Sequence, residues 1–324
     1  MSILRSFLVA ILAMLALMST ALAQDGRYPN KSIRMLVPFS PGALTDVIAR
    51  MYAEKMGARL GQSVVVENRP GSGGILASQA MLAAPADGYT VQMVSSSHAV
   101  NPTLYAKLPY DTQRDIAGVA LVASSPSVVV VSPALGVKNL RELVALAKQR
   151  PGSLNYGSAG IGAATHLVGE YLRAQAQVDM VHVPYKGVQE AVAEVMAGRI
   201  QVAFPPIALA MNQMKAGKII GLAVTGAERS SLMPEVPTAQ ESGLAGFEYS
   251  IWYALVAPAK VPRAALEVLA REVQQVTAMP EVRERMVNQG LIPKSLLLAE
   301  FDAYIGAEID KMGRLVKASG AKAE

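Results

Sequence analysis

The chain has 324 residues, of which 52% are hydrophobic and 17% are charged, and its formal net charge is +5. This composition excludes an intrinsically disordered chain, and the length suggests about two domains. The cysteine count of 0 excludes disulfides and thiolate metal sites. The basic residues are scattered and form no stripe with aromatic residues, which disfavours nucleic acid as a partner. A mild positive charge favours small anionic ligands instead.

Residues 1–23 have the pattern of a secretory signal peptide. Arg5 precedes an apolar run that ends in an Ala-Leu-Ala cleavage site at 21–23. Cleavage there predicts a periplasmic chain that begins at Gln24. The alternative is a retained transmembrane anchor, which the shortness of the run and the lack of a charged stop disfavour.

The first part of the mature chain alternates between strand and helix patterns. Short runs rich in branched apolar residues predict strands at 33–39, 63–69 and 89–96. Apolar residues at helical spacing predict helices at 44–60 and 74–84. This βαβαβ order favours a largely parallel sheet with helices on its faces.

The alternation restarts after a β-rich run at 119–133, which is long enough to leave one sheet and enter another. The predicted elements that follow are helices at 139–149, 164–176 and 188–199 and strands at 154–158, 178–185, 200–206 and 219–225. A second long β-rich run lies at 249–258, and mostly helical sequence completes the chain.

These elements predict an α/β chain with two lobes, each a mostly parallel sheet flanked by helices. The C-terminal helices have no sheet of their own and must dock on the first lobe. The first lobe is therefore expected to comprise 24–123 and 249–324, and the second 124–248. Two long crossing strands between two lobes are typical of a hinged binding protein. A single large doubly wound domain is the alternative.

One stretch of the predicted second lobe, NYGSAGIGAATHLVGEYL at 155–172, runs from a strand through small residues into a helix. Ligands of parallel α/β sheets bind beyond the carboxyl ends of the strands, where helix N-termini present unpaired N–H groups. The glycines at 157, 160 and 162 allow close approach of the backbone, and Ser158 and Thr165 add hydroxyl donors. Such a loop can hold an anion without a cation.

The stretch VPFSPGALTDVIAR at 37–50 has the same organisation in the predicted first lobe. Gly42 and Ala43 supply backbone N–H groups there, and Pro41 stiffens the approach. The alternative is ordinary turn chemistry, with Thr45 or Asp46 acting only as a helix N-cap. The occurrence of one such loop in each lobe favours a binding site.

Motifs for catalysis, metals and cofactors are missing from the sequence. GSGG at 71–74 fits no dinucleotide fingerprint, and no phosphate-binding loop or HExxH motif occurs. A hydrolase pair of Ser158 and His166 lacks the GxSxG elbow. We therefore expect no catalytic residue, no metal and no cofactor. Trp252 and Tyr253 on the second crossing strand are expected to pack in the core or the hinge.

The sequence resembles the Bug family, the TctC-like extracytoplasmic solute receptors of tripartite tricarboxylate transporters, over nearly all of the mature chain. The resemblance rests on YPNKSIRMLVPFSPGALTDVIAR, VVVENRPGSGG, PADGYTV, NYGSAGIGAATHLVGE, VPYKG, AGKIIGLAVTG, EVPTAQESG and WYALVAP, in this order. It implies a type II periplasmic-binding-protein fold, in which two lobes close on a small carboxylate. Backbone amides, hydroxyls and ordered waters grip the carboxylate in such receptors.

The resemblance also implies a set of ligand-binding residues. In the first lobe these are Phe39, Ser40, Pro41, Gly42, Ala43, Leu44, Asp46, Ser96, His98 and Asn101, with Asp46 organising its loop. In the second lobe they are Ser158, Ala159, Gly160, Gly162, Ala163 and Thr165. Further candidates in this lobe are His166, Tyr185, Lys186, Phe204 and Pro205, and Phe204 with Pro205–Pro206 is expected to give the cleft an apolar wall. Whether Lys186 contacts the ligand or is a solvated loop charge stays open, as does the contact of His166.

The sequence departs from the family pattern at three places. The first loop has Ala43 where the family usually has a second glycine, and Gln201 stands where members often have Asp. Pro205 follows Phe204 where many members have an Asp that could pair with a ligand cation. This loss disfavours amino acids and leaves dicarboxylates, tricarboxylates or aromatic carboxylates as ligands. It also fits a receptor that has changed its role.

The leading hypothesis is a monomeric, non-enzymatic receptor that delivers a carboxylate to the membrane permease subunits of a tripartite transporter. A sensory protein that presents its ligand to a membrane sensor kinase is the alternative, because both functions need only ligand-driven closure. A secreted hydrolase is the third, and it lacks a credible nucleophile and base.

Overall fold

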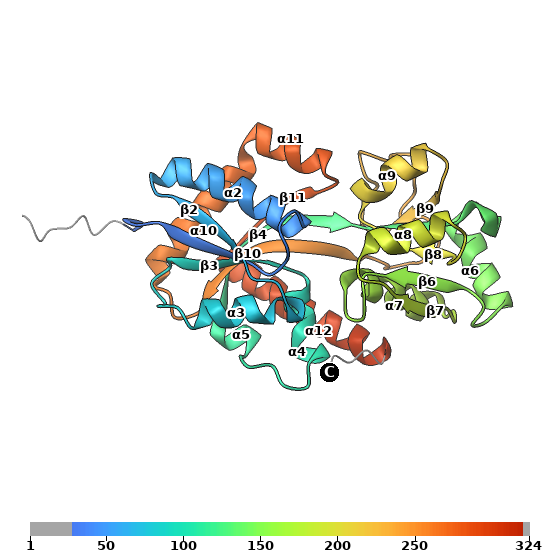
Figure 1. The fold of residues 1–324 in the computed structure, drawn as a ribbon, viewed down its shortest axis with the longest axis horizontal. Helices are drawn as coiled ribbons and strands as arrows, with labels where there is room; N and C mark the ends of the chain where they lie inside the picture. The colour runs from blue at the N-terminus through green and yellow to red at the C-terminus, as the bar shows by residue number, and fades with distance from the viewer. Residues whose placement is uncertain (1–27, 320–324) are drawn as a thin grey trace, which may run out of the picture.

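The structure is a computed structural model that describes residues 28–319. It has two lobes, which β4 and β10 connect and along which α12 runs (Figure 1). The predicted signal peptide, its cleavage site and the alternative membrane anchor lie outside the described residues. Between residues 28 and 319, no helix combines the length and apolar character that a bilayer crossing requires.

The first lobe is built on a six-stranded sheet of order β11-β4-β10-β3-β1-β2. Its strands are β1 Ile33–Val37, β2 Val64–Asn68, β3 Thr90–Ser95, β4 Ile116–Pro126, β10 Ser250–Pro258 and β11 Ile292–Leu297. Its helices are α2 Leu44–Leu60, η1 Ser72–Gly74, α3 Ile75–Leu82, α4 Ser97–Leu104, α5 Thr112–Asp115, α10 Arg263–Ala278, α11 Pro280–Asn288 and α12 Leu298–Ser319.

The second lobe is built on a five-stranded sheet of order β7-β6-β8-β5-β9. Its strands are β5 Val128–Val131, β6 Asn155–Ser158, β7 Val181–Pro184, β8 Val202–Ala203 and β9 Ile220–Val224. Its helices are η2 Pro133–Leu135, α6 Leu140–Gln149, α7 Ala164–Ala176, α8 Val188–Met196 and α9 Ile207–Lys215.

The two-lobed α/β architecture is confirmed, but both sheets are mixed rather than mostly parallel. β1 pairs in parallel with β2 and β3, and β6 with β7 and β8. The crossing strands run the other way: β10 is antiparallel to β3 and β4, and β5 is antiparallel to β8 and β9. Parallel neighbours require a crossover connection, which is usually a helix. A strand that passes from one lobe to the other has no such connection, so it can pair antiparallel to its neighbours.

The predicted long run at 119–133 does cross between the sheets, since only Ser127 separates β4 from β5. Thr225 forms hydrogen bonds with both segments at which the chain passes between the lobes. Its hydroxyl accepts the Ser127 N–H at 2.8 Å and donates to the Tyr249 carbonyl at 2.7 Å. The backbone N–H of Tyr249 donates in turn to the Thr225 carbonyl at 2.8 Å. The two connecting segments are thus joined by buried hydrogen bonds between Ser127, Thr225 and Tyr249.

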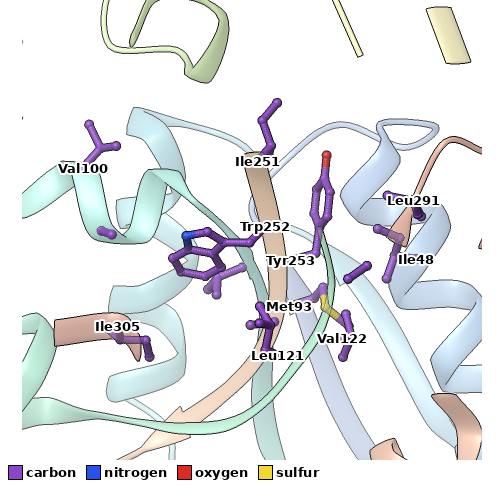
Figure 2. Close-up of a cluster of buried hydrophobic side chains, with 14 of the residues drawn as sticks. Ile48, Met93, Val100, Leu121, Val122, Ile251, Trp252, Tyr253, Leu291 and Ile305 are labelled. Carbon is purple, nitrogen blue, oxygen red and sulfur yellow. The ribbon is translucent and has the colours of Figure 1, made fainter. Parts of the chain in front are cut away.

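The largest fully buried side chain of the structure is Trp252, on the crossing strand β10. Figure 2 shows Trp252 and Tyr253 on opposite sides of the strand, as the two-residue period of a strand requires. The indole N–H of Trp252 donates to the buried carboxylate of Glu308 at 3.1 Å. The packing predicted for Trp252 is therefore what the structure shows, and its indole joins β10 to α12.

Candidate functional site

A cleft of about 410 Å³ lies between the lobes at the carboxyl ends of β1, β3 and β6. From the first lobe it is lined by Phe39, Ala43, Leu44, Thr45, Gly73, Ser95, Ser96, Ser97, Asn101, Leu104, Tyr105, Ile251 and Tyr253. From the second it is lined by Ala159, Ile161, Gly162, Ala163, Ala164, Thr165, Val188 and Pro206. None of these described lining residues is charged.

The first-lobe loop turns into α2 through a left-handed glycine. Gly42 has φ 83° and donates its N–H to the Asp46 carboxylate at 2.9 Å. Asn68 and Arg50 donate to the same carboxylate at 2.8 and 3.0 Å. Burial opposes the charge of Asp46, but these hydrogen bonds outweigh it and lower the pKa of the carboxyl group. Asp46 therefore organises the loop, as the sequence predicts, and it does not line the cleft.

The second-lobe loop turns into α7 in the same way. Gly162 has φ 76° and donates its N–H to Nδ1 of His166 at 3.1 Å. The Ala159 N–H donates to the Thr165 hydroxyl at 2.9 Å. These bonds hold the loop against the first turn of α7, so that its small residues form the cleft wall.

The first residues of both helices lie in the cleft wall. Leu44 and Thr45 begin α2, and Ala164 and Thr165 begin α7; all of them line the cleft. Within residues 28–319 none of these amides has a protein acceptor. Helix N-termini carry partial positive charge and stabilise an anion by about 0.3–1 kcal/mol each at exposed sites. The arrangement can hold carboxylates with backbone N–H groups alone.

A cluster of ionisable side chains packs behind the second-lobe loop. The rings of His166 and His182 stack at a centroid distance of 4.0 Å, and Nε2 of His182 lies 2.6 Å from the Ser158 hydroxyl. Burial lowers the pKa of both histidines, and the neighbouring His166 helps lower that of His182 to about 4. Ser158 is fully buried, so neither histidine pairs with a hydroxyl that a substrate can reach. This placement gives no support to a hydrolase.

The end of β3 and the helix α4 form a further part of the cleft wall. The Ser95 and Ser97 hydroxyls lie 3.1 Å apart, and the Asn101 amide donates to the Gly73 carbonyl at 3.1 Å. His98 lies behind this wall, and burial lowers its pKa to about 4. Its Nε2 has no partner among the described residues.

The structure brings part of the predicted residue set to the cleft. The predicted residues that line it are Phe39, Ala43, Leu44, Ser96, Asn101, Ala159, Gly162, Ala163 and Thr165. The predicted residues that do not line it are Ser40, Pro41, Gly42, Asp46, His98, Ser158, Gly160, His166, Tyr185, Lys186, Phe204 and Pro205. Contact of the first group with a ligand stays a prediction.

Several residues of the second group have other positions for physical reasons. Phe204 is fully buried with its ring against Tyr156, and the neighbouring Pro206 reaches the cleft instead. Pro205 uses its carbonyl to accept the Val128 N–H at 2.9 Å. Lys186 is exposed and lies outside the lining. In this structure Phe204 is thus a core residue and not the apolar wall of the cleft.

Several residues that line the cleft are not in the predicted set, among them Thr45 of α2 and Ile251 and Tyr253 of β10. Thr45 was considered only as a helix N-cap, yet it lines the cleft without making a cap hydrogen bond. Ile251 and Tyr253 alternate along β10, and Tyr253 stands beside Ser95 in the sheet register. Period-two alternation along the second crossing run indicates that both lie on one side of the strand, but register with β3 decides that this side faces the cleft.

Comparisons with known proteins agree with this geometry. The family described as "Tripartite tricarboxylate transporter family receptor" matches residues 48–321. A protein from the tcbD-tcbE intergenic region of Pseudomonas sp. strain P51 is 36% identical over 89% of this chain and 86% of its own length. Protein BugT of Bordetella pertussis is 34% identical over 91% of each chain.

Two solved structures are similar and carry carboxylates. Rpa4515 of R. palustris with adipate has a TM-score of 0.80 and 29% identity, over 91% of this chain and 99% of that one. MatC from Rhodopseudomonas palustris with bound malate has a TM-score of 0.75 and 28% identity, over 89% of this chain and 100% of that one.

Proposed function

Because the chain belongs to the receptor family of tripartite tricarboxylate transporters, we propose that it captures a small carboxylate between its lobes and delivers it to the membrane permease. It does so in the periplasm after cleavage of residues 1–23, as a monomer and without catalysis. Family membership establishes the solute-binding role; the ligand class and the delivery step are the proposal.

One observation carries the proposal: two helix N-termini from different lobes meet at a cleft whose described lining has no charged side chain. An anion can be held there by N–H groups of both lobes, which favours closure around it. A buried ammonium would find no carboxylate in the lining and would cost several kcal/mol.

The ligand class is a carboxylate without a cationic group and with an apolar body. Leu104, Ile161 and Val188 supply apolar surface, and Ile161 remains 59% exposed. Adipate and malate, bound in the two similar structures, have carboxylates at both ends and no cation.

Matched pairs of ligands test the proposal. Thermal shift and calorimetry should compare succinate with aspartate and adipate with 2-aminoadipate. We expect only the members without an ammonium group to stabilise the protein, by about 2.7 kcal/mol at a hundredfold excess over Kd. Tighter binding of the zwitterions would contradict the ligand class, and no binding of any carboxylate would contradict the function.

Closure is proposed to occur about Ser127 and Tyr249, so that the six-stranded sheet with its helices moves as one unit and the five-stranded sheet with its helices as the other. Small-angle scattering with and without the best ligand of the panel should give a smaller radius of gyration for the bound form. An unchanged radius despite saturation would argue against these moving units.

A further inference from the structure

The amide of Gly162 depends on one nitrogen of one histidine. Its N–H donates to Nδ1 of His166 at 3.1 Å, four residues further along the chain. A ring nitrogen accepts a hydrogen bond only when it carries no proton, so the bond requires His166 to be neutral with its proton on Nε2. Gly162 lines the cleft, whereas His166 does not.

We propose that His166 is a positioning residue of the cleft: its unprotonated Nδ1 fixes the Gly162 amide, and protonation of that nitrogen loosens the loop and weakens carboxylate binding. The binding part of this inference rests on the proposed function. The part that concerns the loop does not.

The groups around the His166 ring oppose a second proton. His182 of β7 stacks on it at 4.0 Å, and a charge on either ring would repel a charge on the other. On α7, Nε2 of His166 lies 4.0 Å from Glu170, too far for a hydrogen bond. That carboxylate already accepts from Arg173 at 2.8 and 3.0 Å and from the Tyr156 hydroxyl of β6.

Burial of the ring, with Arg173 adding to it, therefore keeps the pKa of His166 below its ordinary value, although Glu170 pulls the other way. The neutral ring and the Gly162 bond are complete above the ordinary histidine pKa of about 6.5, and they are lost as the pH falls through the lower pKa of the folded protein.

Loss of the bond matters because Gly162 is held tightly. Its φ of 76° lies in the left-handed region, and a Cβ at this position would lie 2.4 Å from Leu104 across the cleft. A protonated Nδ1 would point a second donor at the Gly162 N–H. The loop would then have to move in a place where the opposite lobe leaves no room.

The first lobe supplies the control. Asp46 occupies the corresponding position and accepts the Gly42 N–H through a side-chain oxygen at 2.9 Å. A short side-chain oxygen is thus sufficient for this loop geometry. His166→Asn should keep an acceptor for Gly162 and remove the titration, whereas His166→Leu should remove the acceptor.

Nitrogen-15 NMR of the mature protein, followed from about pH 8 to pH 4.5, tests the loop directly. The three histidines are assigned with His166→Asn and His182→Asn variants. We expect an unprotonated Nδ1 on His166 at neutral pH, and a Gly162 amide resonance that shifts with the same midpoint as this ring. A protonated Nδ1 at neutral pH, or a Gly162 amide that ignores the titration, would overturn the proposal whether or not a ligand is known.

Calorimetry with succinate, malate and adipate tests the consequence for binding. We expect the Kd ratio of wild type to His166→Asn to be near one at neutral pH and to rise about tenfold per pH unit below the His166 pKa. The ratio at each pH cancels the titration of the probe itself. His166→Leu, if its thermal unfolding remains cooperative, should bind at least tenfold more weakly at every pH.

The outcomes separate the two proposals. A constant ratio between wild type and His166→Asn would overturn the role of His166 while leaving the proposed function intact. Failure of all three acids to bind at neutral pH would contradict the proposed function, and the NMR titration would still decide whether His166 holds Gly162.

Discussion

The turns that lead into α2 and α7 have the same backbone at Gly42–Ala43 and at Gly162–Ala163. Gly42 and Gly162 have φ values of 83° and 76°, and the alanine after each has φ −63° or −64° with ψ 153°. In both loops the alanine N–H donates at 3.2 Å to the carbonyl three residues earlier. One geometry, built once in each lobe, therefore aims a helix N-terminus at the cleft from either side.

The loops differ in the side chain that holds the glycine amide. Asp46 is an ionised acceptor that Arg50 and Asn68 also bind. His166 is a neutral acceptor stacked on His182. In both lobes this turn has an acceptor four residues after the glycine, and the acceptor can be charged or neutral. The chemistry of the acceptor then sets the pH range in which each loop is formed.

The largest effect is expected from Gly162→Ala, with Gly42→Ala as its counterpart. Both place a side chain at positive φ, which costs about 1–2 kcal/mol. Only at 162 does the added Cβ meet a neighbour, Leu104 Cδ2 at 2.4 Å; at 42 nothing lies within 4 Å. We expect calorimetry with succinate to show at least a hundredfold loss for Gly162→Ala and about a tenfold loss for Gly42→Ala.

The clash is tested by combining Gly162→Ala with Leu104→Ala. The double variant should bind better than Gly162→Ala alone, because the truncated leucine leaves room for the methyl group. Equal losses for the two glycine variants, or no recovery in the double variant, would show that the lobes do not approach at this point when the ligand is bound.

A smaller effect is expected at Asp46. Asp46→Leu removes the carboxylate that accepts the Gly42 N–H and one Asn68 amide hydrogen, and a hydrogen bond to a charged group contributes about 1.5–3 kcal/mol. Urea unfolding should show this loss, and Asp46→Asn, which keeps one acceptor oxygen, should recover part of it. Succinate binding should weaken about tenfold in Asp46→Leu.

The pH range of this loss is also predictable. Because the hydrogen bonds of Asp46 lower its pKa, the stability that they contribute is complete above the unfolded value of about 3.9 and falls only below it. Acid sensitivity of the first loop between about pH 4 and 7 would contradict the contrast with His166.

The helices behind both loops were predictable from sequence. The ranges predicted for α2 and α7 agree with Leu44–Leu60 and Ala164–Ala176, because small residues end the strand and helical periodicity begins at once. β11 was not predicted. Its strand Ile292–Leu297 contains Pro293 and Lys294 and has mixed exposure, so its pairing with β4 depends on tertiary contact rather than on a local pattern.

The candidate site was predictable where the backbone forms it and less so where side chains complete it. Ala43 and Gly162 follow from the loop pattern, and both line the cleft. Tyr253 does not follow from it, because the side of a crossing strand that faces the cleft is set by register with β3.

The smallest effect is expected from Lys186→Ala, which tests whether the two loops suffice without a cation. Lys186 is exposed, lies outside the cleft lining, and makes its hydrogen bond to Glu190 through the backbone N–H, which alanine keeps. Calorimetry should therefore show less than about a twofold change in succinate affinity, since distant exposed charges are largely screened at physiological salt. Wild-type affinity should also change little between low and high salt, because fixed N–H groups that contact a carboxylate are screened much less than separated surface charges. A loss above about tenfold in Lys186→Ala, together with a steep salt dependence, would mean that closure carries this side chain to the ligand and that the paired helix N-termini are only part of the grip.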